Sequence, residues 1–194
     1  MKRLGIAEHR EAFEDLRAAY AEPQRFYHTA GHISSCLRLL DDVAGLAGSQ
    51  EEVELALWFH DAVYDPRAKD NELKSADWAS DFLERAGASE GSRARIRGHI
   101  IATEHDAAPS GPDSALVVDI DLAILGSPPE AYQAFEANIR REYRWVPRPL
   151  YRRKRREVLD SFLTRPSIYF TDYFRDRYEP AARANLQTAI QALS

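Results

Sequence analysis

The chain has 194 residues, which suits one domain, and 44% of them are hydrophobic, which is enough to build a core. Its 26 basic and 31 acidic residues give a net charge of −5, which argues against a dedicated nucleic-acid-binding protein. The single cysteine, Cys36, excludes an internal disulfide framework and any Cys-x-x-Cys site.

The amino-terminal residues lack the pattern of a signal peptide. Residues 1–4 are followed at once by charged side chains, among them Glu8 and Glu11, rather than by a long apolar stretch. No other segment combines the length and hydrophobicity of a transmembrane span. We therefore expect a cytoplasmic protein without a membrane segment.

Helical periodicity dominates the first half of the chain. Apolar residues three and four positions apart predict an amphipathic helix over 33–43. Residues 53–63 are apolar on more than one side, as expected of a central buried helix. A third helix is predicted over 73–83, closed by Gly87, and a fourth over 96–103.

The middle of the chain contains one ambiguous segment. Residues 109–113 are typical of a loop, whereas the apolar run 116–125 fits either a buried strand or a helix. Ser127 predicts a helix start, because Pro128 suits the first turn and Glu130 completes a capping box.

A last helix is predicted to begin at Pro180. Its buried stripe would consist of Leu186, Ile190 and Leu193. Because strand-like alternation is scarce throughout, the expected fold class is all-α, a single-domain helical bundle.

Two adjacent polar residues interrupt the predicted central helix. His60 and Asp61 lie in the apolar run 55–64, where burial of unpaired polar groups is costly. A divalent metal ion compensates both, since imidazole and carboxylate are among its usual ligands. The pair therefore indicates a metal site.

Two other segments carry further candidate ligands. His28 and His32 are four residues apart and would share one helical face, although such histidines can also be merely solvated. Asp119 and Asp121 lie in the apolar run, where the alternative is a helix cap or a carboxylate bonded to backbone.

Taken in order, these motifs resemble the HD-domain superfamily of metal-dependent phosphohydrolases, and most closely a bacterial branch of similar length. The branch pattern is Tyr-His-x-x-x-His, Trp-Phe-His-Asp-Ala-Val-Tyr-Asp, Asn-Glu-x-x-Ser, Thr-x-His, Asp-x-Asp-Leu-x-x-Leu-Gly and Ile-Arg-x-Glu-Tyr. The matching residues are Tyr27, His28 and His32, then 58–65, Asn71, Glu72 and Ser75, Thr103 and His105, 119–126 and 139–143. The match covers most of the chain.

The resemblance implies an all-helical HD fold across residues 1–194, with a core at about 25–126 and C-terminal helices at about 128–194. It also implies a divalent ion, Mn, Mg, Co, Fe or Zn, bound by four side chains. Those ligands are His32, His60, Asp61 and Asp121. Asp121 is preferred to Asp119 as the distal ligand because it directly precedes Leu122, which leaves Asp119 to orient a histidine ligand.

Further roles follow from the same resemblance. Asp61 and Glu72 are the expected catalytic residues, with Glu72 near the attacking water unless it is only a solvated helix carboxylate. His28 and His105 would bind phosphate, protonate the leaving group or hold a second metal, unless they are core or capping histidines. Lys69 is either a phosphate contact or a surface charge.

Residues 140–156 form a basic tract in this acidic chain. Guanidinium groups bind phosphate, so Arg140 and Arg144 are candidates for substrate binding on an anionic-substrate rim or a nucleic-acid surface. The alternative is a solvated helix–loop–helix in which Glu142 and Glu157 balance the charge.

We therefore expect an enzyme that hydrolyses a phosphate ester with a metal-activated water, acting on a nucleotide or another small phosphorylated metabolite. One alternative is a nucleotide- or nucleic-acid-binding module with a non-catalytic HD site. Another is a di-iron oxygenase of the HD type, in which His28 and His105 supply additional ligands. A nucleic-acid partner is not favoured, and the sequence does not indicate an oligomeric state.

Overall fold

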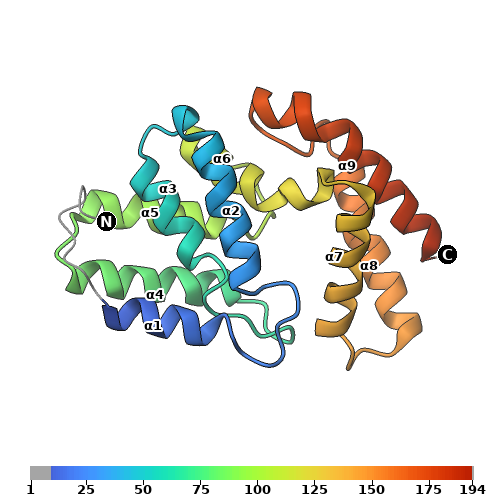
Figure 1. The fold of residues 1–194 in the computed structure, drawn as a ribbon, viewed down its shortest axis with the longest axis horizontal. Coiled ribbons are helices and arrows are strands. Elements are labelled where there is room, and N and C mark those ends of the chain that lie inside the picture. Colours follow the sequence, from blue (N-terminus) through green and yellow to red (C-terminus); the bar gives the residue numbers. More distant parts are fainter. Residues whose placement is uncertain (1–9, 194) are drawn as a thin grey trace. The chain divides into compact units, whose positions relative to one another are not determined.

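A computed structural model describes residues 10–193, and their regular structure is entirely helical (Figure 1). Because residues 10–193 contain no strand, the all-α prediction is confirmed. The chain divides into two compact units, Met1–Asp121 and Leu122–Ser194. The predicted single-domain organisation stays a prediction, and the amino-terminal residues 1–9, used above to argue against a signal peptide, lie outside the described residues.

Unit 1 is built around one buried helix. Its helices are α1 (Arg10–Ala19), α2 (Ala30–Asp42), η2 (Ala44–Leu46), α3 (Gln50–Phe59), α4 (Asn71–Arg85), α5 (Glu90–Ala102) and α6 (Pro112–Asp121). Helices α2, α4, α5 and α6 all contact α3, and Val53, Ala56 and Leu57 on α3 are fully buried. This confirms the prediction of a central helix that is apolar on more than one side.

The central helix ends at Phe59, four residues earlier than predicted. His60 is its C-cap, and Asp61 lies in the following turn. The chain leaves the helix because side chains replace helical hydrogen bonds. Arg25 donates to the carbonyl oxygens of Asp61 and Ala62, and Ser75 Oγ accepts from the Val63 N–H at 3.0 Å.

The other predicted helices of unit 1 are present as α2, α4 and α5. Gly87 follows α4 with a φ of 75°, a left-handed conformation that favours glycine. The Ala88 N–H bonds to the Leu83 carbonyl at 2.9 Å, which satisfies the end of the helix. The ambiguous run 116–125 is helical, with α6 passing at Asp121 directly into the 3₁₀ segment η3 (Leu122–Gly126).

Unit 2 contains η3, α7 (Pro129–Glu142), α8 (Arg148–Leu163) and α9 (Asp172–Ala192). Helix α9 packs on η3, α7 and α8. Tyr169 Oη donates to the Leu122 carbonyl at 3.1 Å, and Asn185 Nδ2 donates to the Leu125 carbonyl at 2.8 Å. A Cβ on Gly126 would lie 2.6 Å from the Tyr178 carbonyl oxygen, so η3 and α9 approach each other closely at this glycine.

Two predicted helix starts in unit 2 are wrong. Helix α7 begins at Pro129 with Pro128 as its N-cap, rather than being capped by Ser127. Pro128 precedes another proline, which disfavours the helical conformation, and its ψ is 145°. Helix α9 begins at Asp172, so Pro180 lies inside it.

Pro180 is tolerated within α9 because it is exposed and its fixed φ suits a helix. One backbone hydrogen bond is lost, while buried Phe174 anchors the preceding turns. Leu186 and Ile190 are buried as predicted, whereas Leu193 is the half-buried C-cap.

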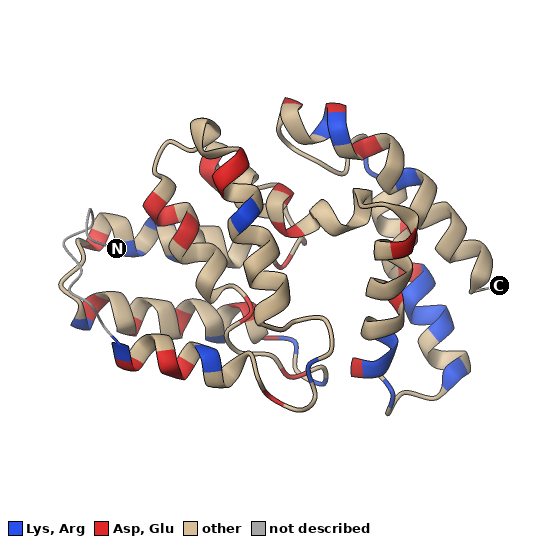
Figure 2. Cartoon of the chain, viewed as in Figure 1, with Lys and Arg blue, Asp and Glu red and all other residues tan. Residues whose placement is uncertain are grey.

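The basic tract 140–156 covers the end of α7, a short loop and the start of α8, where Lys and Arg gather (Figure 2). Part of its charge is balanced within α8, since Lys154 Nζ lies 2.6 Å from Glu157 Oε2. Of the helices among residues 10–193, none is both long enough and apolar enough to cross a bilayer. The cytoplasmic assignment stays a prediction.

Candidate metal centre

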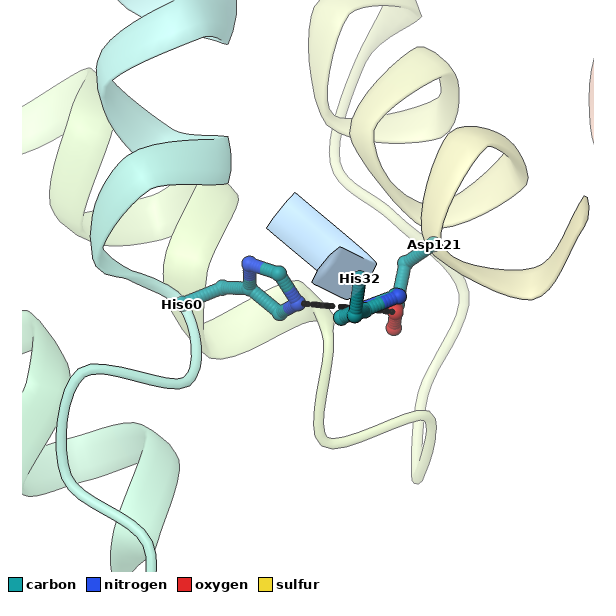
Figure 3. Close-up of side chains that lie close together, drawn as sticks. All are labelled: His32, His60 and Asp121. Carbon is teal, nitrogen blue, oxygen red and sulfur yellow. Dashed lines mark hydrogen bonds and ion pairs between the residues drawn. The ribbon is translucent and has the colours of Figure 1, made fainter. Parts of the chain in front are cut away.

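Three segments of unit 1 bring two imidazoles and a carboxylate together (Figure 3). His32 lies in the first turn of α2, His60 follows α3, and Asp121 is the last residue of α6. His32 Nε2 lies 3.2 Å from His60 Nε2 and 3.1 Å from Asp121 Oδ1. His60 Nε2 lies 3.5 Å from the same Asp121 oxygen, so the three atoms form a tight triangle.

Asp61 approaches this triangle from the side of the histidines. Its Oδ2 lies 3.0 Å from His60 Nε2 and 3.7 Å from His32 Nε2. The same oxygen is buried and forms no hydrogen bond. A buried carboxylate oxygen is costly unless a cation compensates it, and either a protonated His60 or a bound metal ion can do so here.

The backbone orients the ring of His60. Its Nδ1 lies 2.9 Å from the Leu57 carbonyl oxygen, a pure acceptor, so Nδ1 carries the proton that is donated there. In the neutral ring, Nε2 therefore turns its lone pair toward His32 and Asp121. This is the arrangement in which a backbone carbonyl fixes the tautomer of a metal-binding histidine.

Electrostatics keep both carboxylates ionised. Burial alone raises the pKa of Asp121, but hydrogen bonds from His105, His32 and His60 hold that pKa well below its usual range. Burial likewise opposes ionisation of Asp61, while His60 and His28 lower the pKa of Asp61.

His60 shows the complementary effect. Burial lowers its pKa, yet the charges of Asp61 and Asp121 raise that pKa well above the ordinary value. Without an ion, a proton on His60 therefore balances part of the negative charge. A divalent cation at the same point would displace that proton, as metal binding to histidine generally does.

The donor set fits an ion sterically. Two ligands that bind one ion at about 2.1 Å lie about 3.0 Å apart at right angles and about 3.4 Å apart at the tetrahedral angle. The distances that join the two imidazole nitrogens to each other and to the Asp61 and Asp121 oxygens range from 3.0 to 3.7 Å. His32, His60 and Asp121 are therefore spaced to hold a small divalent cation, whereas Asp61, the fourth predicted ligand, lies beside the two histidines but outside this group of three.

Asp119 lies outside this group although it is only two residues from Asp121. Residues two apart on an α-helix point about 200° from each other, so α6 can present only one of these carboxylates to the histidines. Asp119 is fully buried on another side of the helix. Its expected role in orienting a histidine ligand stays a prediction.

Two of the other predicted site residues interact with this group, His105 through a direct contact and Glu72 through the charge of Asp61. His105 Nε2 lies 3.1 Å from Asp121 Oδ2, and His105 has a φ of 60°, an uncommon conformation that often marks functional sites. Glu72 is half-buried at the start of α4. Burial raises the pKa of Glu72, and the Asp61 carboxylate raises it further.

The remaining predicted residues have other surroundings. His28 lies in the turn before α2, stacks on Tyr64 with ring centroids 4.2 Å apart, and also lies beside His32 with ring centroids 6.3 Å apart. Lys69 is exposed in the loop before α4. Arg140 and Arg144 belong to unit 2, where Arg140 Nη1 donates to the Tyr143 carbonyl at 2.5 Å. The substrate-binding roles of Lys69, Arg140 and Arg144 stay predictions.

Sequence patterns missed Arg25, which joins two of the ligand-bearing segments. Its side chain is buried, and Nη1 donates to the carbonyl oxygens of Asp61 at 2.6 Å and His28 at 3.1 Å. Nη2 donates to the Ala62 carbonyl at 2.9 Å, and Nε donates to Glu22 at 3.0 Å. No periodicity marks Arg25, because its distant partners are backbone groups 36 and 37 residues away.

Comparisons with protein-family models, with curated proteins and with solved structures found no match. The resemblance of the motifs to the HD superfamily therefore stays a prediction. Independently of that resemblance, the buried His32 and His60 and the half-buried Asp121 form a set of nitrogen and oxygen donors whose spacing suits one cation.

Proposed function

We propose that this protein is a divalent-metal-dependent phosphohydrolase of the HD type. The observation that carries the proposal is the convergence of the His32 and His60 imidazole nitrogens with the Asp121 carboxylate, next to a second carboxylate on Asp61. Two histidines and two carboxylates suit a borderline or hard divalent cation and leave positions for water and substrate. The proposed substrate is a phosphate ester, such as a nucleotide or another small phosphorylated metabolite.

A bound divalent ion supplies a Lewis acid, which makes a water molecule more acidic and draws charge from a phosphoryl oxygen. The protein's own groups orient the ligands and move protons. The Leu57 carbonyl fixes the ring of His60, and His105 holds the second oxygen of Asp121. Glu72, whose pKa is raised by burial, accepts a proton from the attacking water at its carboxylate.

The first experiment measures the metal content of the full-length protein after loading with Mn²⁺ and desalting. We expect one ion per chain in the wild type and a large loss in His60→Gln and Asp121→Asn. The matched control is His99→Gln, which removes another buried histidine of unit 1 outside the candidate site. Equal metal in Asp121→Asn and the wild type would contradict the ligand assignment.

The second experiment separates hydrolysis from binding. The Mn²⁺-loaded protein and His60→Gln are assayed on p-nitrophenyl phosphate, bis-p-nitrophenyl phosphate and a panel of nucleotides. We expect turnover that EDTA abolishes, that Mn²⁺ restores and that His60→Gln lacks. A loaded wild type that cleaves none of these esters would favour the binding-module alternative, and two ions per chain would favour the di-iron alternative.

A further inference from the structure

Unit 2 contains a groove of about 670 Å³ between α7, α8 and α9. Its volume lies within the range of roughly 300–1,000 Å³ that is typical of small-molecule sites. On α9 the groove is lined by short side chains, including Ala184, Thr188, Ala189 and Ala192. Because these side chains are small and partly exposed, they leave room for an apolar body along the helix.

Two tyrosines and Glu136, which is paired with Arg155, lie on the α7 and α8 side of the groove. Tyr132 and Tyr151 line the groove, and the Tyr132 hydroxyl donates to Glu136 at 3.0 Å. Among the described residues that line the groove, Glu136 is the only acid, and Arg155 binds its two carboxylate oxygens at 2.5 and 3.1 Å. The single negative charge of the wall is therefore already neutralised.

Two arginines that line the groove, Arg140 and Arg148, have no carboxylate partner among the described residues. Arg140 stacks on the Tyr151 ring, 4.6 Å from its centroid, and donates only to neutral carbonyl oxygens. Arg148 also lines the groove and is exposed, without a carboxylate partner within the described part of the chain. The Tyr151 hydroxyl is buried in the same wall and forms no hydrogen bond.

We propose that this groove binds an amphipathic organic anion. The apolar body of the ligand lies against the alanines of α9 and the tyrosine rings, and its anionic group lies between Arg140 and Arg148. The guanidinium groups of Arg140 and Arg148 favour a ligand with a negative charge, and the short side chains of α9 set the width of the apolar part that the groove accepts. This site shares no residue with the metal centre and is independent of the proposed hydrolysis.

The test is a fluorescence titration of the full-length protein with 8-anilinonaphthalene-1-sulfonate. The matched control ligand is N-phenyl-1-naphthylamine, which has the same aromatic body without the sulfonate. We expect one sulfonate probe per chain, bound about tenfold more tightly than the neutral probe, because the charge-assisted contact is lost with the neutral one. Equal affinity for both probes would overturn the proposal.

Protein variants locate the binding site. Thr188→Trp fills the groove from an exposed position and should abolish binding, while circular dichroism checks that the fold is retained. Arg148→Gln should weaken binding about tenfold, whereas Arg153→Gln, an exposed arginine of α8 that does not line the groove, should leave it unchanged. Unchanged binding in Thr188→Trp would overturn the site. The proposal would also be overturned if the wild type were a dimer and Thr188→Trp converted it to a monomer, because a second copy of the chain would then occupy the groove.

Discussion

At the residue scale, Arg25 is the side chain whose replacement should matter most outside the ligands themselves. Arg25→Lys keeps the charge but loses the planar fork that reaches the carbonyls of His28, Asp61 and Ala62. We expect the free energy of unfolding to fall by about 2–4 kcal/mol, because buried backbone acceptors lose their charged donor. Urea denaturation measures this change.

The same substitution should weaken Mn²⁺ binding, since the backbone that carries Asp61 loses its anchor. The control is Arg17→Lys on the exposed side of α1, where we expect a change within about 0.5 kcal/mol. If Arg25→Lys were as stable as Arg17→Lys, the buried arginine would not hold the ligand-bearing turn.

His99 should make the stability of the protein sensitive to acid. Burial lowers the pKa of His99, although Asp113 and Glu52 oppose that shift. Below the unfolded-state pKa of about 6.5, the unfolded chain binds a proton that the folded protein binds less readily, so stability falls as the pH falls. We expect the wild type to lose more stability than His99→Gln between about pH 7 and about pH 5.

Urea denaturation of both proteins at the two pH values provides the comparison. Parallel losses of stability would show that His99 does not titrate differently in the folded and unfolded states. His99 also bonds to Ser114 Oγ through Nδ1 at 2.7 Å, so His99→Gln should lower the stability at neutral pH as well.

Sequence patterns singled out candidate site residues where a polar side chain interrupts an apolar run. His60 and Asp61 stood out because they interrupt an apolar run, and Asp121 was preferred to Asp119 from the motif alone. The structure places Asp121 beside both histidines. Arg25 could not be found in this way, because a side chain that binds distant carbonyls leaves no local pattern.

At the element scale, Gly126 controls how closely η3 packs on α9. A Cβ there would lie 2.6 Å from the carbonyl oxygen and 3.0 Å from the Cα of Tyr178, both backbone atoms that cannot move alone. We expect Gly126→Ala to destabilise the protein by about 1–3 kcal/mol, because η3 and α9 must separate. Thermal and urea denaturation measure the effect.

Gly98 provides the opposite case. It lies on the exposed side of α5, with nothing within 4 Å of an added Cβ. Gly98→Ala should therefore stabilise the protein by about 0.5–1 kcal/mol through helix propensity alone. If Gly126→Ala and Gly98→Ala changed the free energy of unfolding in the same direction, this explanation of the packing of η3 on α9 would be wrong.

Element identity was more predictable than element boundaries. The period of apolar residues revealed α2, α4 and α5, but residues 116–125 stayed ambiguous because the segment is buried on several sides. The end of α3 depends on Arg25 and Ser75, which are distant in sequence. The start of α9 was missed because proline normally opens a helix, whereas Pro180 lies within one.

At the scale of the whole molecule, an occupied metal centre should stabilise unit 1. A ligand that binds only the folded state at about 100 times its dissociation constant adds about 2.7 kcal/mol to the free energy of unfolding. We expect Mn²⁺ to raise the thermal unfolding midpoint of the wild type and of His99→Gln, but not of His60→Gln. Calorimetry with and without EDTA makes the comparison, and an equal rise in His60→Gln would indicate that the ion binds elsewhere.

The sequence analysis separated a core at about 25–126 from C-terminal helices at about 128–194 within one domain, whereas the two units of the structure meet between Asp121 and Leu122. Linkers are usually marked by glycine, proline or polar residues, yet the division falls between Asp121 and Leu122, inside an apolar run. Helix α6 passes there directly into η3 without an intervening loop. The amino-acid composition therefore does not mark the boundary between the two units.

The spacing of the candidate ligands along the chain has a consequence for biosynthesis. His32 lies 28 residues before His60 and 89 residues before Asp121. A growing polypeptide presents both histidines long before it contains the carboxylate that completes the set. An ion can thus be held by all of its ligands only after α6 has been translated and packed, so that capture of the metal would coincide with completion of unit 1.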